Sequence, residues 1–70
     1  MNNDLVGKCV LQEILKRKYM SPTELSDKTG ISIHQLSAYI NNKRTMSLPT
    51  AKLISNALGC YIDDLYDWHI

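Results

Sequence analysis

The side chains best suited to chemistry are hydrogen-bond donors and cations at the end of a short predicted helix. Asn41 and Asn42 close the segment that begins at Ser32, and the cationic pair Lys43 and Arg44 follows directly. Amides and cations of this kind hold phosphate oxygens. The sequence offers no glycine-rich phosphate loop, no metal-ligand spacing and no nucleophile beside a base. We therefore expect binding of a phosphate backbone, without catalysis, a metal or a cofactor.

Two short helices joined at a glycine must position these side chains. The run Ser21–Glu24 predicts a helix start, in which the serine caps, proline takes the first helical position and glutamate completes a capping box. Gly30 supplies the positive φ that ends this helix. Ser32 caps the next helix, which extends to about Ile40. A helix, a tight turn with glycine and a second helix form the unit that enters the major groove of DNA.

Three further helices complete the predicted fold. Apolar residues at helical spacing predict them over residues 5–18, 47–58 and 62–66. The second of these begins at Ser47 and ends at Gly59 by the same capping rules. No stretch shows sustained alternation with period two, so strands are not expected. The predicted fold class is all-α, a compact five-helix bundle, in a single helix-turn-helix domain over residues 1–70.

Length, cysteine use and charge narrow the class of protein. The chain has 70 residues, of which 44% are hydrophobic, which suits one small globular domain. Cys9 and Cys60 lie far apart and follow no secretory signal, so we expect buried free thiols in a soluble, cytoplasmic protein. The net charge is only +1, but residues 1–52 carry +4 and residues 53–70 carry −3. One face could therefore meet phosphate while the other stays away from it.

From about Leu11 to Leu65 the chain resembles the phage repressor and Cro-like (lambda-repressor-like) helix-turn-helix family. The matching residues have the order and spacing of the family: Leu25, Gly30, Ser32, Leu36, Ser37, Asn41, Lys43, Arg44, Ser47, Leu48, Ile54, Ala57, Leu58, Gly59, Asp63 and Leu65. The resemblance implies a five-helix bundle that binds a double-stranded DNA operator, usually as a dimer.

The resemblance also implies two sets of site residues. The phosphate contacts would come from Ser21, Asn41, Lys43 and Arg44. The base-reading or partner-binding face would comprise Ser32, Ile33, His34, Gln35, Ser37 and Ala38. On that face Ile33 and Ala38 could touch a thymine methyl, Gln35 suits adenine, and His34 could donate to guanine or to a phosphate.

The chain departs from the family pattern at three points. Pro22 stands where the family usually has a glutamine, which removes a donor to phosphate. Asn42 replaces the usual loop glycine, a change that asparagine tolerates at positive φ. Leu15 and Ile40 stand where many relatives have an arginine and a glutamate, so a buried ion pair is replaced as a unit by apolar side chains.

Two functions fit these observations. The first is a sequence-specific DNA-binding transcriptional regulator of phage or bacterial type, with its third helix in the major groove. The alternative is an antirepressor that keeps the fold but binds another helix-turn-helix repressor, which Pro22, Ile33, Ala38 and the near-neutral charge favour. Four C-terminal residues, mostly aromatic and expected to be exposed, are candidates for a homodimer contact: Tyr61, Tyr66, Trp68 and Ile70. Equally, Trp68 could fold back onto the small core.

Overall fold

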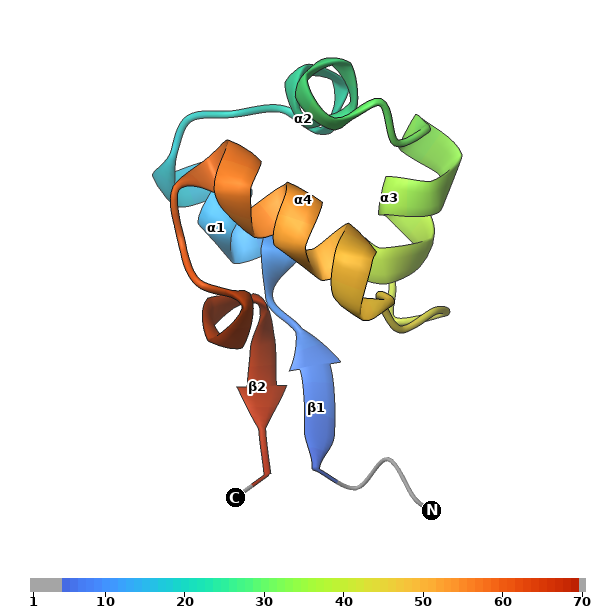
Figure 1. Ribbon diagram of the computed structural model, residues 1–70, viewed down its shortest axis with the longest axis vertical. Helices are drawn as coiled ribbons and strands as arrows, with labels where there is room; N and C mark the ends of the chain where they lie inside the picture. Colours follow the sequence, from blue (N-terminus) through green and yellow to red (C-terminus); the bar gives the residue numbers. More distant parts are fainter. Residues whose placement is uncertain (1–4, 70) are drawn as a thin grey trace.

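The computed structural model describes residues 5–69, and within them the chain forms four α-helices, one 3-10 helix and a two-stranded antiparallel sheet (Figure 1). In chain order the elements are β1 (Val6–Cys9), α1 (Leu11–Arg17), α2 (Pro22–Thr29), α3 (Ile33–Ile40), α4 (Leu48–Leu58), η1 (Ile62–Leu65) and β2 (Tyr66–Trp68). In the described part of the chain, no helix is long and apolar enough to cross a membrane.

The helix boundaries predicted from capping residues are confirmed for α2, α3 and α4. The Oγ of Ser21 accepts the Glu24 N–H, and the Glu24 carboxylate accepts the Ser21 N–H, which closes the capping box. Ser32 and Ser47 cap α3 and α4 in the same way, each accepting a backbone N–H on its hydroxyl oxygen. Gly30 has φ 76° at the end of α2, which a side chain would strain. These boundaries follow from local chemistry.

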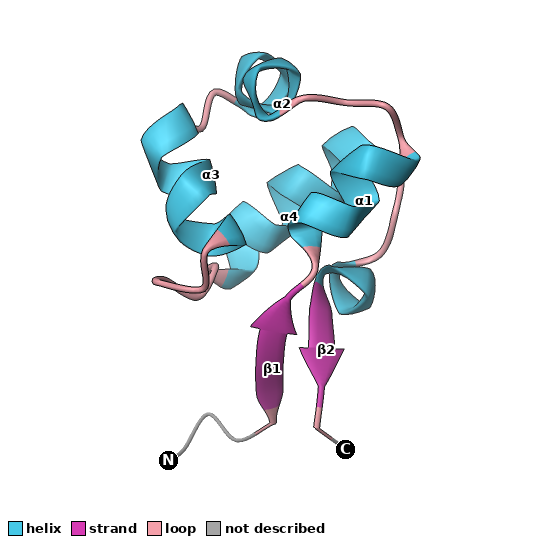
Figure 2. Cartoon of the chain, turned by 180° about the vertical axis from the view of Figure 1, so that it is seen from behind, coloured by secondary structure: helices cyan, strands magenta, loops and turns pink. Residues whose placement is uncertain are grey.

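The prediction of an all-α, five-helix bundle is wrong at both ends of the chain. Residues 6–9 were expected to be helical but form β1, and α1 begins only at Leu11. The fifth helix is the short 3-10 helix η1, and β2 follows it directly. β1 and β2 pair antiparallel and project from one end of the helical body (Figure 2). Strands of four and three residues are too short to show an alternating pattern, and their partners are distant in sequence.

Gly7 explains why the two strands approach so closely. A Cβ atom at this position would overlap the backbone carbonyl of Asp67 on β2, so only glycine fits. The register pairs Val6 with Trp68 and Cys9 with Tyr66, with an irregularity between these two pairs. The sheet thus joins segments from the two ends of the sequence into one unit.

All four α-helices contribute to one hydrophobic core. Its fully buried side chains are Leu11, Leu25, Leu36, Ile54 and Leu65, one from each of α1, α2, α3, α4 and η1. Leu15 is buried as well, and Ile40 is half-buried against the core, so neither position needs a charged partner. This packing leaves α3 with one face on the core and one face free.

Candidate nucleic-acid interface

The free face of α3 carries most of the residues predicted for groove contact. Ser32, Ile33, His34 and Ser37 are exposed, whereas Gln35 and Ala38 are half-buried. The opposite face is held by Leu36 and by Tyr39, which is buried as a core residue. In Figure 1, α3 lies at the edge of the molecule, and no other described element covers its outer side. A helix with one exposed polar face of this kind can enter a groove.

Part of the hydrogen-bonding capacity of Gln35 is used within the protein. Its Nε2 donates to the Oη of Tyr39 over 2.9 Å, and its backbone N–H donates to the Oγ of Ser32 over 3.1 Å. One side-chain amide hydrogen and the Oε1 acceptor are left to reach a base edge. The bond to Tyr39 fixes the direction of the amide, so Gln35 would present a set orientation to any ligand.

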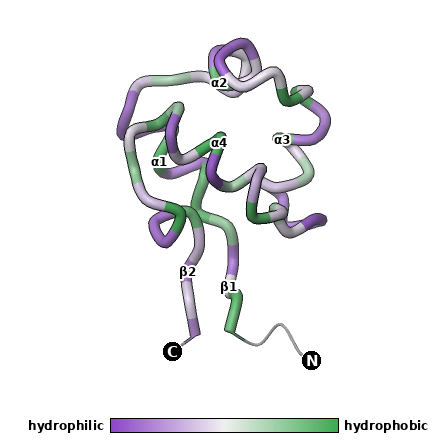
Figure 3. Tube along the Cα trace, viewed as in Figure 1, coloured by the Kyte–Doolittle hydropathy of each residue, from purple (hydrophilic) through white to green (hydrophobic). Residues whose placement is uncertain are grey.

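The loop of residues 41–47, between α3 and α4, holds the cationic pair. The backbone N–H groups of Lys43 and Arg44 both donate to the carbonyl of Ala38, over 2.8 and 3.3 Å. The Asn41 N–H donates to Ser37 over 2.9 Å. Because these amides are occupied, any phosphate contact must come from the side chains, which are exposed. Figure 3 shows the hydrophilic tip of this loop extending beyond α3 and α4.

Asn42 has a different role from its neighbours in the loop. It takes the positive φ of 61° expected for the position that is usually glycine. Its Oδ1 also accepts the backbone N–H of Cys9 in β1 over 2.7 Å. Sequence reasoning missed this bond, because the two residues are 33 positions apart and nothing local signals their pairing.

The N-terminus of α2 is a poorer phosphate site than the predicted role of Ser21 requires. The capping box brings the Glu24 carboxylate to 3.4 Å from the Ser21 backbone nitrogen, and Pro22 has no N–H to offer. An approaching phosphate would meet a carboxylate at this helix end. The capping box therefore occupies the Ser21 backbone N–H and leaves only the hydroxyl hydrogen of Ser21 for a phosphate.

The predicted C-terminal cluster of exposed aromatic residues is only partly present. Tyr61 is 80% exposed, but the prediction of an exposed Tyr66 is wrong, since only 9% of that residue is exposed. The Tyr66 Oη accepts the backbone N–H of Met46 over 3.0 Å, and burial raises the pKa of its phenol. Trp68 is half-buried, packs against the ring of Tyr66 and donates to the carbonyl of Asp63. Ile70 lies outside the described residues.

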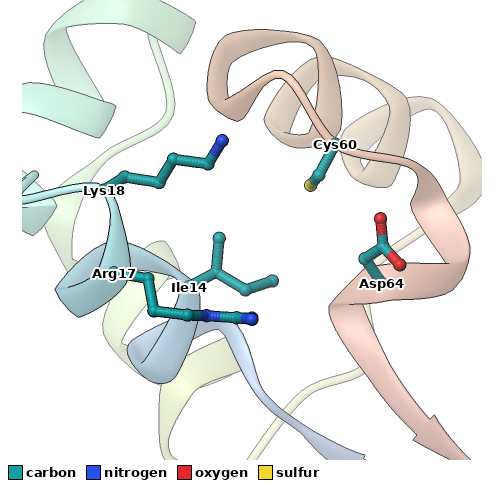
Figure 4. A pocket seen from close by; sticks show the side chains of 5 residues that line it. All are labelled: Ile14, Arg17, Lys18, Cys60 and Asp64. Atoms are coloured by element: carbon teal, nitrogen blue, oxygen red, sulfur yellow. The ribbon is translucent and has the colours of Figure 1, made fainter.

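A separate groove of about 460 Å³ lies between α1 with the residue after it and the segment that joins α4 to η1, together with η1 itself, and none of its lining residues belongs to α3. Figure 4 shows Arg17 and Lys18 on one wall of this groove and Cys60 and Asp64 on the other. Burial raises the pKa of the Cys60 thiol, Asp64 adds to this effect, and the two cations oppose it. Cys60 and the buried Cys9 are both free thiols. In residues 5–69 no cluster of His, Cys, Asp and Glu could hold a metal ion.

Comparisons with known proteins place this geometry in context. Residues 10–69 match the family model of the Cro/C1-type HTH DNA-binding domain. The SPbeta prophage-derived uncharacterized HTH-type transcriptional regulator YopS of Bacillus subtilis (strain 168) is 41% identical over 66 residues, which cover 93% of this chain and 89% of the relative. The SPbeta prophage-derived uncharacterized HTH-type transcriptional regulator YotL of the same organism is 32% identical over 60 residues, or 84% of this chain and 75% of the relative.

Proposed function

The chain belongs to the Cro/C1-type HTH DNA-binding domain family, and we propose that it acts as a sequence-specific transcriptional regulator of phage or bacterial type that binds double-stranded DNA. The observation that carries this proposal is the free face of α3 beside a loop with two exposed cations. The function is one of binding alone, without a reaction or a cofactor.

In this proposal α3 enters the major groove and recognises the base sequence. His34 and Ser37 can donate to and accept from base edges, and Ile33 offers an apolar surface for a thymine methyl group. Gln35 adds an amide whose orientation is set by Tyr39. Each mismatched base pair should cost about 1–3 kcal/mol of binding free energy.

The side chains of Asn41, Lys43 and Arg44 position the protein on the duplex. They are exposed at the end of α3, so they could reach the phosphates that flank the groove entered by that helix. Ser21 retains a hydroxyl hydrogen to donate, but the neighbouring Glu24 carboxylate weakens this contact. Lys43 and Arg44 therefore supply most of the phosphate contact, and affinity should fall with salt.

A single small domain offers little interface, so two copies are expected on a two-fold operator. Tyr61 is the most exposed of the predicted dimer residues and could contribute to this contact, with the exposed part of Trp68. The buried Tyr66 would act only by supporting the tryptophan ring beside it.

The test is fluorescence anisotropy with duplexes from the neighbourhood of the gene and a duplex of mixed sequence, at two salt concentrations. We expect one duplex to bind more tightly than the others and to lose affinity as salt rises. Weak, equal binding to every duplex would contradict the proposal. A search for a protein partner of α3, such as another helix-turn-helix repressor, would then follow.

Ile33→Ala tests the role of α3 against a matched control. Ile33 is 48% exposed, and Leu53 on α4 is an aliphatic residue of similar exposure, at 49%. Ile33→Ala should change the order of preference among duplexes, because it removes the contact with a base edge. Leu53→Ala should leave that order unchanged. Equal behaviour of the two variants would exclude Ile33 from base reading.

A further inference from the structure

Two hydrogen bonds tie the loop of residues 41–47 to the sheet, one near each end of the loop. The Oδ1 of Asn42 accepts the backbone N–H of Cys9 over 2.7 Å. The Oη of Tyr66 accepts the backbone N–H of Met46 over 3.0 Å. The exposed Lys43 and Arg44 lie between these two points. The segment that carries both cations is therefore held on each side by a different strand.

The two sheet residues that bond to the loop also pair with each other across the sheet. Cys9 of β1 and Tyr66 of β2 are opposite each other in the antiparallel register. The next residues also bond, since the Val10 N–H donates to the Leu65 carbonyl over 2.9 Å. The Met46–Tyr66 bond is buried, so water competes little for it, whereas the Cys9–Asn42 bond is part-buried because Asn42 itself is exposed. We name Asn42, Cys9, Tyr66 and Met46 the loop clamp.

We propose that the loop clamp positions Lys43 and Arg44 for phosphate, which makes Asn42 and Tyr66 positioning residues for DNA binding. This inference rests on the proposed function, in which the two cations contact the DNA backbone. Asn42 and Tyr66 touch no DNA in this scheme. They act through the backbone between them, and only when the first and last strands of the described chain are paired.

The physical basis is the conformational entropy of a short loop. Free residues sample several backbone conformations, and binding must then restrict them at a cost in affinity. The first half of the loop is also held by the carbonyl of Ala38. From Thr45 to Met46 the backbone approaches α4, and the Met46 N–H bond fixes this second half. Loss of the clamp should leave the cations present but less well oriented.

Tyr66→Phe is the first variant to measure, because it keeps the buried ring and removes only the acceptor for the Met46 N–H. Binding to a short duplex of mixed sequence, at a temperature where the variant is folded, should weaken by roughly two- to tenfold. The slope of log affinity against log salt should decrease by about 1 if one phosphate contact is lost. Asn42→Gly should act in the same direction, because glycine accepts the positive φ but cannot bond to Cys9.

Ile54→Val is the matched control for a loss of stability alone. Ile54 is fully buried in α4 and is not part of the clamp. Its variant should lower the unfolding midpoint without changing the affinity or the salt slope of the folded protein. If Tyr66→Phe behaves like Ile54→Val, the clamp has only a structural role and the inference fails.

A double-mutant cycle separates the inference from the proposed function. In a background of Lys43→Ala and Arg44→Ala, Tyr66→Phe should have no further effect on affinity, because it acts through those cations. A full effect in that background would overturn the positioning role. Unchanged affinity after Lys43→Ala and Arg44→Ala would instead contradict the phosphate assignment. In that case, amide hydrogen exchange still tests the clamp: Tyr66→Phe should speed exchange at Lys43 and Arg44, and unchanged exchange there would overturn it.

Discussion

The chain contains two basic connections that look similar in sequence and differ in the structure. Residues 16–20 close α1 with three cations, and residues 41–47 link α3 to α4 with two. Each connection has one non-glycine residue at positive φ, Tyr19 at 54° and Asn42 at 61°. The Asn42 side chain bonds to β1, whereas that of Tyr19 is 95% exposed.

The surroundings of the cations differ as well. Arg17 and Lys18 line a groove whose opposite wall carries Cys60 and Asp64 (Figure 4). Lys43 and Arg44 lie in a loop with no acidic residue, at the end of the helix with the free polar face. A count of cations would favour the first connection for phosphate. The bond that anchors Asn42 to β1 and the lack of acidic residues in the loop that carries Lys43 and Arg44 favour the second connection. The position of the cations, and not their number, therefore distinguishes the two connections.

The largest expected effect concerns the core beneath the first connection. Leu15 is buried, and its carbonyl accepts the Met20 N–H that closes this connection. Leu15→Arg should destabilise the protein by about 3–5 kcal/mol, because it buries a charge without a partner. The measurement is the urea midpoint, with Gln12→Arg on the exposed side of α1 as the control. An unchanged midpoint would show that residue 15 is not held in the core.

The second effect compares the two cation pairs directly. Lys43→Ala with Arg44→Ala should weaken binding to all duplexes by about 1 kcal/mol per contact at moderate salt and reduce the salt slope by about 2. Arg17→Ala with Lys18→Ala removes the same formal charge and should have a much smaller effect. Equal losses in the two double variants would mean that net charge alone drives binding.

The third and smaller effect concerns the residues at positive φ. Tyr19→Gly should stabilise the protein by about 0.5–1 kcal/mol, because it relieves a left-handed backbone at a side chain that is almost fully exposed. Asn42→Gly gains less relief, because asparagine tolerates positive φ better than tyrosine, and it also loses the bond to Cys9, so it should give no net stabilisation. Thermal unfolding measures both. A similar gain in each variant would mean that the Asn42 bond contributes no stability.

The smallest expected effect concerns the influence of the Lys18 side chain on the pKa of Cys60. Lys18 and Arg17 lower the pKa of the Cys60 thiol, against the larger effect of burial. Lys18→Ala should therefore raise that pKa further and reduce the thiolate fraction at a given alkaline pH. Ultraviolet absorbance of the thiolate, measured in a Cys9→Ala background, reads this change, and Lys28→Ala on α2 is the control. An unchanged Cys60 pKa would show that the Lys18 ammonium does not act on the thiol.

Much of the fold and part of the candidate site could be predicted from the sequence, because the signals are local. Ser21, Ser32 and Ser47 cap their own helices, and Gly30 and Gly59 end theirs, each through bonds within a few residues. The spacing of Leu36 and Tyr39 also set which face of α3 is buried, and so which face is free. The resemblance to the phage repressor and Cro-like family rests largely on residues of these same helices, their caps and the loop after α3.

Only the tertiary structure showed the sheet, the burial of Tyr66 and the hydrogen bonds between the sheet and the loop of residues 41–47. β1 pairs with β2 across almost the whole chain, and neither strand is long enough to show its period in sequence. Tyr66 is buried because β2 places it opposite Cys9, so its exposure could not be judged from residue type. The bonds of Asn42 to Cys9 and of Met46 to Tyr66 join residues 33 and 20 positions apart. Capping energies act within one turn and can be read along the chain, whereas these bonds exist only once packing brings distant segments together.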